Sequence, residues 1–160
     1  EYRKQIENSN IKKGYQGLMK FINELRLYLK KKYPEYLVAN SVQEGTMDYA
    51  YFYFFPKKLK EKRVKAIIVF VHDSFTFEIF LAGYNKQIQA KYLEIFETKR
   101  WEKYEIATTT EGVDYIMKHR LVENPDFSDA DVLKKQIEEE ALNFIENVEY
   151  FLEINPLEFF

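Results

Sequence analysis

The sequence contains no cysteine, and histidine is scarce. The lack of cysteine excludes disulfide bonds, cysteine-ligated zinc, iron–sulfur clusters and cysteine nucleophiles. Only His72 and His119 could supply imidazole ligands, and they lie far apart in the sequence, so no metal-binding motif is indicated. We therefore predict no metal site and no cofactor. A domain that needs no disulfide also suits a reducing compartment, and we expect a cytoplasmic location.

Long apolar runs, a strong charge of one sign and glycine-rich loops are missing as well. No segment approaches the roughly 20 apolar residues that a membrane span requires, so we expect no membrane partner. The formal net charge is −2, which gives no overall attraction to nucleic acid. Neither a G-x-x-x-x-G-K-[ST] phosphate loop nor a G-x-G-x-x-G turn is present. Without a long linker or an internal repeat, the chain fits a single domain over residues 1–160.

Aromatic residues, in contrast, are abundant: there are 13 Tyr, 14 Phe and 1 Trp. Each large ring supplies much buried area, so one interpretation is a core built from rings. The other is a pocket lined by rings. Most of the rings recur at helix or strand periodicity, which favours the core.

The spacing of apolar residues predicts four helices, over residues 10–32, 85–100, 111–120 and 129–152. In the first helix, apolar residues recur every three or four positions from Ile11 to Leu29. We expect a polar cap at its start among residues 8–10, and we expect Pro34 to end it. Ser128 to Asp131 resembles a capping box at the start of the last helix.

Residues with high strand propensity predict a sheet of three to five strands, over residues 36–42, 47–55, 64–72, 75–82 and 105–109. Residues 64–72 and 75–82 predict an antiparallel hairpin around the His72-Asp73-Ser74 turn. Residues 47–55 are aromatic at both alternating positions, so we expect both faces of that strand to be at least partly covered. Grouped strands bracketed by helices indicate an α+β fold with a mostly antiparallel sheet. The tail over residues 153–160 breaks the helical pattern, and its role is left open.

Five stretches of the sequence carry a family resemblance: Gly45-Thr46-Met47-Asp48, Tyr51-Phe52-Tyr53-Phe54-Phe55-Pro56, Val69-Phe70-Val71-His72-Asp73-Ser74-Phe75, Leu81-Ala82-Gly83-Tyr84-Asn85-Lys86-Gln87 and Val122-Glu123-Asn124-Pro125-Asp126-Phe127. Together they resemble an uncharacterised family of small bacterial proteins, described only as a domain of unknown function. The resemblance covers most of the chain and implies a bacterial, cytoplasmic, single-domain protein. It implies no activity and no catalytic residue, because the family has none assigned.

The most site-like residues flank the second strand of the predicted hairpin. We predict a ligand-binding site that uses His72, Tyr84, Asn85 and Lys86, because a helix start offers free N–H groups to an anion. In the simpler interpretation, Asn85 only caps the helix, Lys86 is solvated and the neighbouring Asp73 only holds the turn. The sequence leaves both interpretations open.

A nuclease is one alternative. The order of helix, three strands, helix and strand is that of the restriction-endonuclease-like core, and Asp73, Glu78 and Lys86 would be its catalytic candidates. Those enzymes need an acid-x-Lys pattern, but Phe80 stands where the lysine should follow Glu78. Element order alone does not establish a function, so a degenerate relative fits better than an active nuclease.

A second alternative is a nucleic-acid binder that uses the basic loop over residues 57–65, which lies between two aromatic strands. A connection between strands is polar in any case, and this favours a solvated loop. Because no catalytic signature converges, we expect a non-enzymatic domain that binds a small ligand or another protein. We also expect homodimers formed through aromatic surface.

Overall fold

The computed structural model describes residues 2–45, 48–108 and 115–157, and it describes side chains from residue 13 onward. The elements and their bounds are α1 Tyr2–Lys32, β1 Leu37–Val38, β2 Gln43–Glu44, β3 Tyr49–Phe55, α2 Lys57–Glu61, β4 Val64–Val71, β5 Thr76–Gly83, α3 Lys86–Thr98, β6 Glu105–Ile106, β7 Met117–Glu123 and α4 Ala130–Ile154. None of the described helices is both long enough and apolar enough to cross a lipid bilayer.

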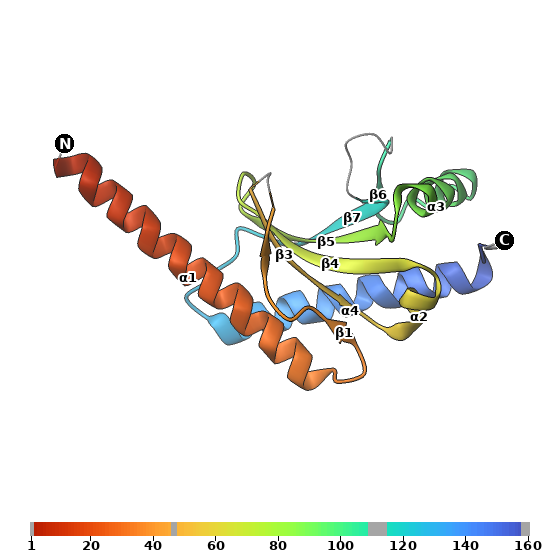
Figure 1. Ribbon diagram of the computed structural model, residues 1–160, viewed down its shortest axis with the longest axis horizontal. Coiled ribbons are helices and arrows are strands. Elements are labelled where there is room, and N and C mark those ends of the chain that lie inside the picture. Colours follow the sequence, from red (N-terminus) through yellow and green to blue (C-terminus); the bar gives the residue numbers. More distant parts are fainter. Residues whose placement is uncertain (1, 46–47, 109–114, 158–160) are drawn as a thin grey trace.

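The strands form one antiparallel sheet with the order β1-β3-β4-β5-β7-β6, and β2 also pairs with β3 (Figure 1). The predicted α+β class is therefore confirmed, with seven strands rather than three to five. The predicted hairpin is confirmed too, because β4 and β5 pair along their whole length, from Val64 opposite Gly83 to Val71 opposite Thr76. This hairpin forms the centre of the sheet.

Helices α1 and α4 cover one face of the sheet, which we call the covered face (Figure 1). On β3 this face carries Ala50, Phe52 and Phe54, each at most 1% exposed. Phe21 of α1 contacts Phe77 of β5 with the ring centroids 5.8 Å apart. Burial of such rings away from water is the largest favourable contribution to folding, so the core lies between this face and the two helices.

Helix α3 packs against the end of the sheet, where β5 ends. A Cβ atom at Gly83 would lie 2.7 Å from the backbone nitrogen of Gln89, so glycine lets the strand and the helix approach closely. The Tyr92 hydroxyl donates a hydrogen bond to the carbonyl of Lys62 at 2.6 Å. Phe96 stacks on Phe151 of α4 at 4.7 Å between centroids. These contacts fix α3 at the end of the sheet.

A buried carboxylate joins α1 to α4. Glu138 is 4% exposed and accepts hydrogen bonds from the hydroxyls of Tyr28, at 2.6 Å, and Tyr33. The ammonium group of Lys32 lies 2.7 Å from the same carboxylate. Burial alone would raise the pKa of Glu138, but these three donors lower it overall. Burial and the bond to Glu138 raise the pKa of Tyr33 to about 12.

The predicted helix over residues 111–120 is wrong. Residues 117–123 form strand β7, and Ile116 donates a backbone hydrogen bond to the carbonyl of Leu81 at 2.6 Å. The spacing of Val113, Ile116 and Met117 imitates a helical stripe, and Met117 and Leu121 are again four residues apart, so the local pattern fits a helix as well as a strand. Pairing with β5 decided between the two periodicities. Residues 111–114 of the predicted helix lie outside the described residues.

Other boundaries differ from the prediction as well. Helix α1 begins at Tyr2 rather than near residue 10, because no glycine or proline before the cap-type residues 8–10 interrupts it. A bend at Asn40 and Ser41 divides the strand predicted over residues 36–42, and only Leu37–Val38 of it pairs as a strand. The strand predicted over residues 105–109 shortens to Glu105–Ile106, and residue 109 lies outside the described residues.

The basic segment over residues 57–65 was expected to be an exposed loop, but residues 57–61 form α2, and residues 64 and 65 begin β4. Pro56 is the residue before the first helical residue, and its carbonyl accepts a hydrogen bond from the backbone N–H of Leu59 at 3.1 Å. Leu59 is 1% exposed, so this short helix is tied to the core. Lys58 forms an exposed ion pair with Glu153 of α4 at 3.5 Å.

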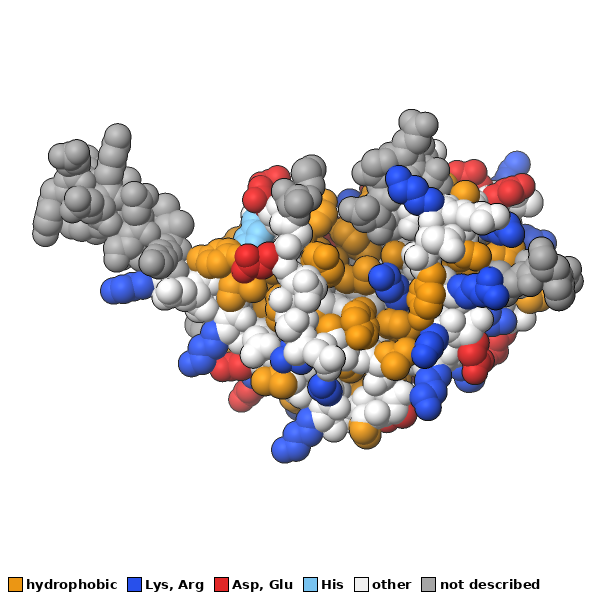
Figure 2. All heavy atoms as spheres, viewed as in Figure 1, with side chains coloured by type: hydrophobic (Ala, Val, Ile, Leu, Met, Phe, Trp, Pro, Cys, Tyr) orange, Lys and Arg blue, Asp and Glu red, His pale blue; other side chains and the backbone are white. Residues whose placement is uncertain are grey.

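The expectation that both faces of β3 are at least partly covered is confirmed only in part. Tyr49 and Tyr51 are half-buried and Tyr53 is 39% exposed, and no described helix covers the sheet face on which they lie. We call this the open face. Figure 2 shows apolar and tyrosine side chains gathered over it, with lysines among them. Tyrosine tolerates such a place because its ring is apolar and its hydroxyl can meet water.

Candidate functional site

The open face contains a hollow of about 520 Å³, which we call the main hollow. Its lining comes from β2, β3, β4, β5 and the start of α3: Glu44, Gly45, Tyr49, Tyr51, Lys65, Ile67, Val69, Phe80, Ala82, Gly83, Asn85, Lys86 and Gln89. Small-molecule sites typically have volumes of roughly 300–1,000 Å³ and a mostly apolar lining with a few polar groups. The main hollow fits this description.

The floor and walls of the main hollow follow from the strand registers. Ile67 and Val69 of β4 and Ala82 of β5 form the floor, because these alternate positions point to the open face. Tyr49 and Phe80 rise from the flanking strands and meet edge to face, with centroids 6.0 Å apart. Tyr51 lies on the same face as Tyr49, two residues further along β3. The result is an apolar floor beside aromatic rings.

The end of the main hollow nearest α3 is basic. Lys65 lies opposite Ala82, and the chain enters α3 only a few residues after Ala82, so Lys65 and Lys86 lie at the same end. Asn85 caps α3 by accepting a hydrogen bond from the backbone N–H of Ile88 at 2.8 Å. The first turn of α3 contains no acidic residue. Neither lysine forms an ion pair or hydrogen bond within the described residues.

The opposite end of the main hollow is closed by Glu44 and Gly45. The Tyr15 hydroxyl of α1 donates a hydrogen bond to the Glu44 carboxylate at 2.6 Å. This hydrogen bond, more than burial, raises the pKa of Tyr15. The Tyr15 ring also stacks on His72 with centroids 5.9 Å apart. Helix α1 therefore reaches around the sheet to the rim of the main hollow.

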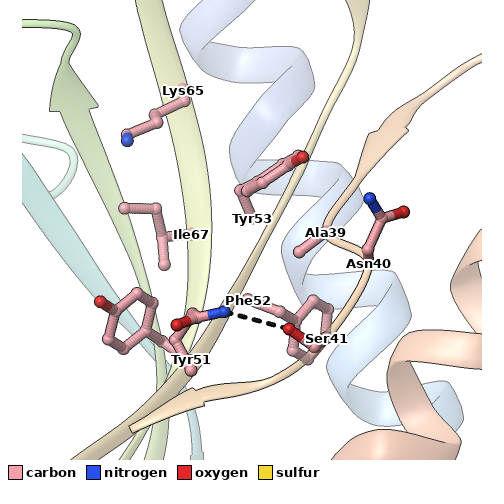
Figure 3. A pocket seen from close by; sticks show the side chains of 9 residues that line it. Ala39, Asn40, Ser41, Tyr51, Phe52, Tyr53, Lys65 and Ile67 are labelled. Carbon is pink, nitrogen blue, oxygen red and sulfur yellow. Dashed lines mark hydrogen bonds between the residues drawn. The ribbon is translucent and has the colours of Figure 1, made fainter. Parts of the chain in front are cut away.

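A second hollow of about 260 Å³ adjoins the first, and we call it the side hollow. The two share Tyr51, Lys65 and Ile67. Figure 3 shows Lys65 and Ile67 extending from β4 beside Tyr51 and Tyr53 of β3, with the bend at Asn40 and Ser41 opposite them. The Gln43 side chain donates a hydrogen bond to the Ser41 hydroxyl at 3.0 Å and steadies this wall (Figure 3). Lys65 therefore serves both hollows.

The tyrosines of the open face differ from those near the helices in their hydrogen bonds. The hydroxyls of Tyr49, Tyr51 and Tyr53 bond to none of the described residues. Yet no buried side-chain nitrogen or oxygen in the described part lacks a partner, so these hydroxyls remain open to solvent. The open face thus presents three hydroxyls that can donate or accept a hydrogen bond.

The structure separates the sequence-predicted site residues into two groups. His72 and Asp73 lie at the turn between β4 and β5, whereas Tyr84, Asn85 and Lys86 follow the far end of β5. The eight residues of β5 span roughly 23 Å, so one small ligand cannot touch both groups. Asn85 and Lys86 line the main hollow. Tyr84 is 46% exposed beside them, and burial together with the nearby Tyr53 raises its pKa.

Glu78, the third catalytic candidate, lies near the middle of β5 and is 4% exposed. The Thr76 hydroxyl donates to its carboxylate at 2.7 Å, and Lys118 and Arg120 of β7 lie 3.9 and 4.0 Å away. Burial alone would lower the pKa of Lys118, but Tyr115, Glu105 and Glu78 raise it overall. A buried carboxylate with these partners is satisfied within the sheet.

The nuclease hypothesis requires a set of carboxylates around a metal ion. In the described part of the chain, no three His, Cys, Asp or Glu side chains come together in a way that could hold one. Asp73 is exposed in a turn, Glu78 is buried on β5, and Lys86 follows the far end of that strand. The structure does not bring these three candidates together.

Sequence reasoning missed several residues of the main hollow. They are Tyr49, Tyr51, Lys65, Ile67, Ala82 and Gln89. One signal could have found the open face: in β3 the tyrosines occupy positions 49, 51 and 53, whereas alanine and phenylalanine occupy positions 50, 52 and 54. Tyrosine has a hydroxyl that can meet water and phenylalanine has none, so this alternation indicates that only the phenylalanine face is fully buried.

Comparison with known proteins identifies a sequence family that the chain matches. The sequence model of the family described as "Domain of unknown function (DUF7000)" matches residues 1–152. No curated protein and no solved structure matches the chain.

Proposed function

Since the chain belongs to that family of unknown function, we propose from its geometry that it is a non-enzymatic domain that binds a small ligand in the main hollow. The observation that carries the proposal is a hollow of about 520 Å³ on a sheet face that no described helix covers. Its volume suits a small molecule, and its lining suits a ligand that is largely apolar.

The lining supports binding rather than catalysis. The described residues of the main hollow include no serine, threonine, cysteine or histidine, and its lysines lie at the opposite end from its carboxylate. Its acidic residue, Glu44, is held by the Tyr15 hydroxyl. The other polar groups are amides, phenols and lysines, which orient a ligand by hydrogen bonds and charge.

A neutral fluorescent probe tests the proposal. Phenylnaphthylamine is apolar and uncharged, and we expect it to bind the protein saturably with a stoichiometry of one. Ala82→Leu adds bulk to the floor and should weaken binding at least about ten-fold, the factor that 1.4 kcal/mol gives. Ala90→Leu makes the same change at an exposed position of α3 and is the matched control.

A second variant removes a wall instead of filling the floor. Tyr51→Ala should also weaken probe binding, and Tyr51 is half-buried on the open face, so the fold should tolerate its loss. Equal binding by the natural protein, Ala82→Leu and Tyr51→Ala, with circular dichroism showing each folded, would refute the proposal.

The other hypotheses remain without a specific observation in their favour. Nucleic-acid binding would require the basic segment, where Leu59 and Lys58 are engaged with the protein itself. A bacterial cytoplasmic protein is what the resemblance implies, and we retain it as an expectation that cell fractionation would test. Exposed Tyr150 and Ile154 of α4, at 66% and 60%, are the apolar surface that a homodimer could use. Sedimentation at several concentrations would test self-association.

A further inference from the structure

The two ends of the main hollow carry side chains of opposite charge. Lys65 and Lys86 lie at the end next to α3, whereas Glu44 lies at the other end, opposite Ala50 of β3. Ala50 pairs with Phe70, which is five residues from Lys65 along β4. The two ends are therefore about 16 Å apart along the strands. A ligand that fills the hollow meets cations at one end and a carboxylate at the other.

Lys65 has no counter-charge of its own. It is half-buried on β4, and it forms no ion pair or hydrogen bond within the described residues. Two other lysines, in contrast, have a carboxylate beside them: Lys118 lies 3.6 Å from Glu105, and Lys32 lies 2.7 Å from Glu138. Because no buried side-chain nitrogen in the described part lacks a partner, the unpaired Lys65 ammonium is open to solvent. An anion carried by a ligand in the hollow can therefore pair with it directly.

The surroundings of Lys65 reinforce the same charge. Lys86 lines the same end, it is exposed, and it too lacks a counter-ion among the described residues. The remaining groups at this end are the amides of Asn85 and Gln89, which carry no charge. Glu44 is the acidic residue of the described lining, and it lies at the opposite end. Two cations therefore face the ligand at the α3 end.

We propose that the ligand of the main hollow is a small aromatic organic anion, with its anionic group at Lys65 and Lys86 and its ring on the floor beside Tyr49, Tyr51 and Phe80. The proposal rests on the proposed function and adds the ligand class. The ring is chosen because aromatic walls favour offset and edge-to-face contacts with another ring. The anion is chosen because a charge-assisted hydrogen bond is stronger than a neutral one.

Two dyes with the same ring system test the proposal. Anilinonaphthalene sulfonate carries a sulfonate group, and phenylnaphthylamine lacks it. The measured quantity is the ratio of their dissociation constants in each variant, at low salt, because salt screens the charge. Lys65→Gln should weaken the sulfonate dye about ten-fold and change the neutral dye less than about two-fold. Lys65→Arg should keep the preference for the anion.

The control separates local from overall charge. Lys60→Gln removes one positive charge at an exposed position of α2, outside the lining of either hollow, and should leave the ratio unchanged. If Lys60→Gln and Lys65→Gln change the ratio equally, or if neither changes it, the anion site is refuted while binding of the neutral dye still supports the proposed function. If the neutral dye does not bind saturably, the proposed function itself is refuted.

Discussion

Both faces of the sheet carry aromatic rings but use them differently. On the covered face, Phe52 and Phe54 are fully buried against helices. On the open face, Tyr51 and Tyr53 of the same strand remain partly exposed. Tyrosines near the helices bond to protein groups, as Tyr92 does to Lys62, whereas the open-face hydroxyls bond to none of the described residues. Aromatic content alone therefore does not distinguish a core from a site. What differs is whether the tyrosine hydroxyls are bonded to protein groups or left open to solvent.

The largest expected effect comes from the covered face. Phe52→Ala removes a ring that is 0% exposed, and we expect the free energy of unfolding to fall by about 3–5 kcal/mol, because a cavity remains. Tyr51→Ala, one residue away on the open face, should cost less than half as much. Urea denaturation of both variants measures the difference. Equal losses would show that the open face is covered as well as the other.

The next effect concerns the junction of the open face with α3. Gly83→Ala places a Cβ atom 2.7 Å from the backbone nitrogen of Gln89, so the strand and helix must separate. We expect the free energy of unfolding to fall by about 2–3 kcal/mol, as at other sites where a side chain is added to a packed interior. We also expect weaker binding of the neutral dye. Ala90→Leu, on the exposed side of the same helix, is the control for stability. A neutral result for Gly83→Ala would contradict the close approach.

A smaller effect is expected at the carboxylate between α1 and α4. Glu138→Gln loses the charge that Lys32, Tyr28 and Tyr33 stabilise, and we expect a loss of about 1–2 kcal/mol at neutral pH. The folded pKa of Glu138 lies below its ordinary value of 4.5, so its contribution is present above pH 4.5 and is lost as pH falls further. Urea denaturation at neutral and acid pH measures the difference in free energy of unfolding between the natural protein and Glu138→Gln, and this difference should become smaller in acid. A difference that does not change with pH would rule out the charge of Glu138 as its cause.

The smallest effect is expected at the three lysines of α2, which line neither hollow of the open face. Simultaneous Lys57→Gln, Lys58→Gln and Lys60→Gln should change stability by no more than about 0.5 kcal/mol, because all three side chains are exposed. Neutral-dye binding should stay the same. Retention on immobilised nucleic acid that falls with salt and with these substitutions would instead favour the nucleic-acid hypothesis.

The sequence predicted correctly those helices and strands whose apolar spacing fits only one kind of secondary structure. The β4–β5 hairpin followed from β-branched and aromatic alternation around a turn. The last helix followed from a long apolar stripe after the capping box predicted over Ser128 to Asp131, although the residue that caps it is Asp129. The pattern failed where two periodicities coincide, as at Ile116 and Met117, because pairing with β5 is a contact that a local window does not contain. Strand β7 was missed for this reason.

The candidate site was predicted only in part, for a related reason. Asn85 and Lys86 were identified because a helix start is visible in the sequence, and both line the main hollow. Lys65 fell both in the predicted strand over residues 64–72 and in the basic segment over residues 57–65, so no site was assigned to it. That Lys65 faces the same hollow as Lys86 depends on the register between β4 and β5, which only the folded sheet defines.

The hydrogen bond from Tyr15 to Glu44 crosses from the helical layer to the rim of the main hollow. The Glu44 carboxylate has lone pairs left beside the one that Tyr15 occupies, so a ligand that reaches this end of the hollow can share the same group. The rim of the hollow and the helical layer therefore have one acidic side chain in common.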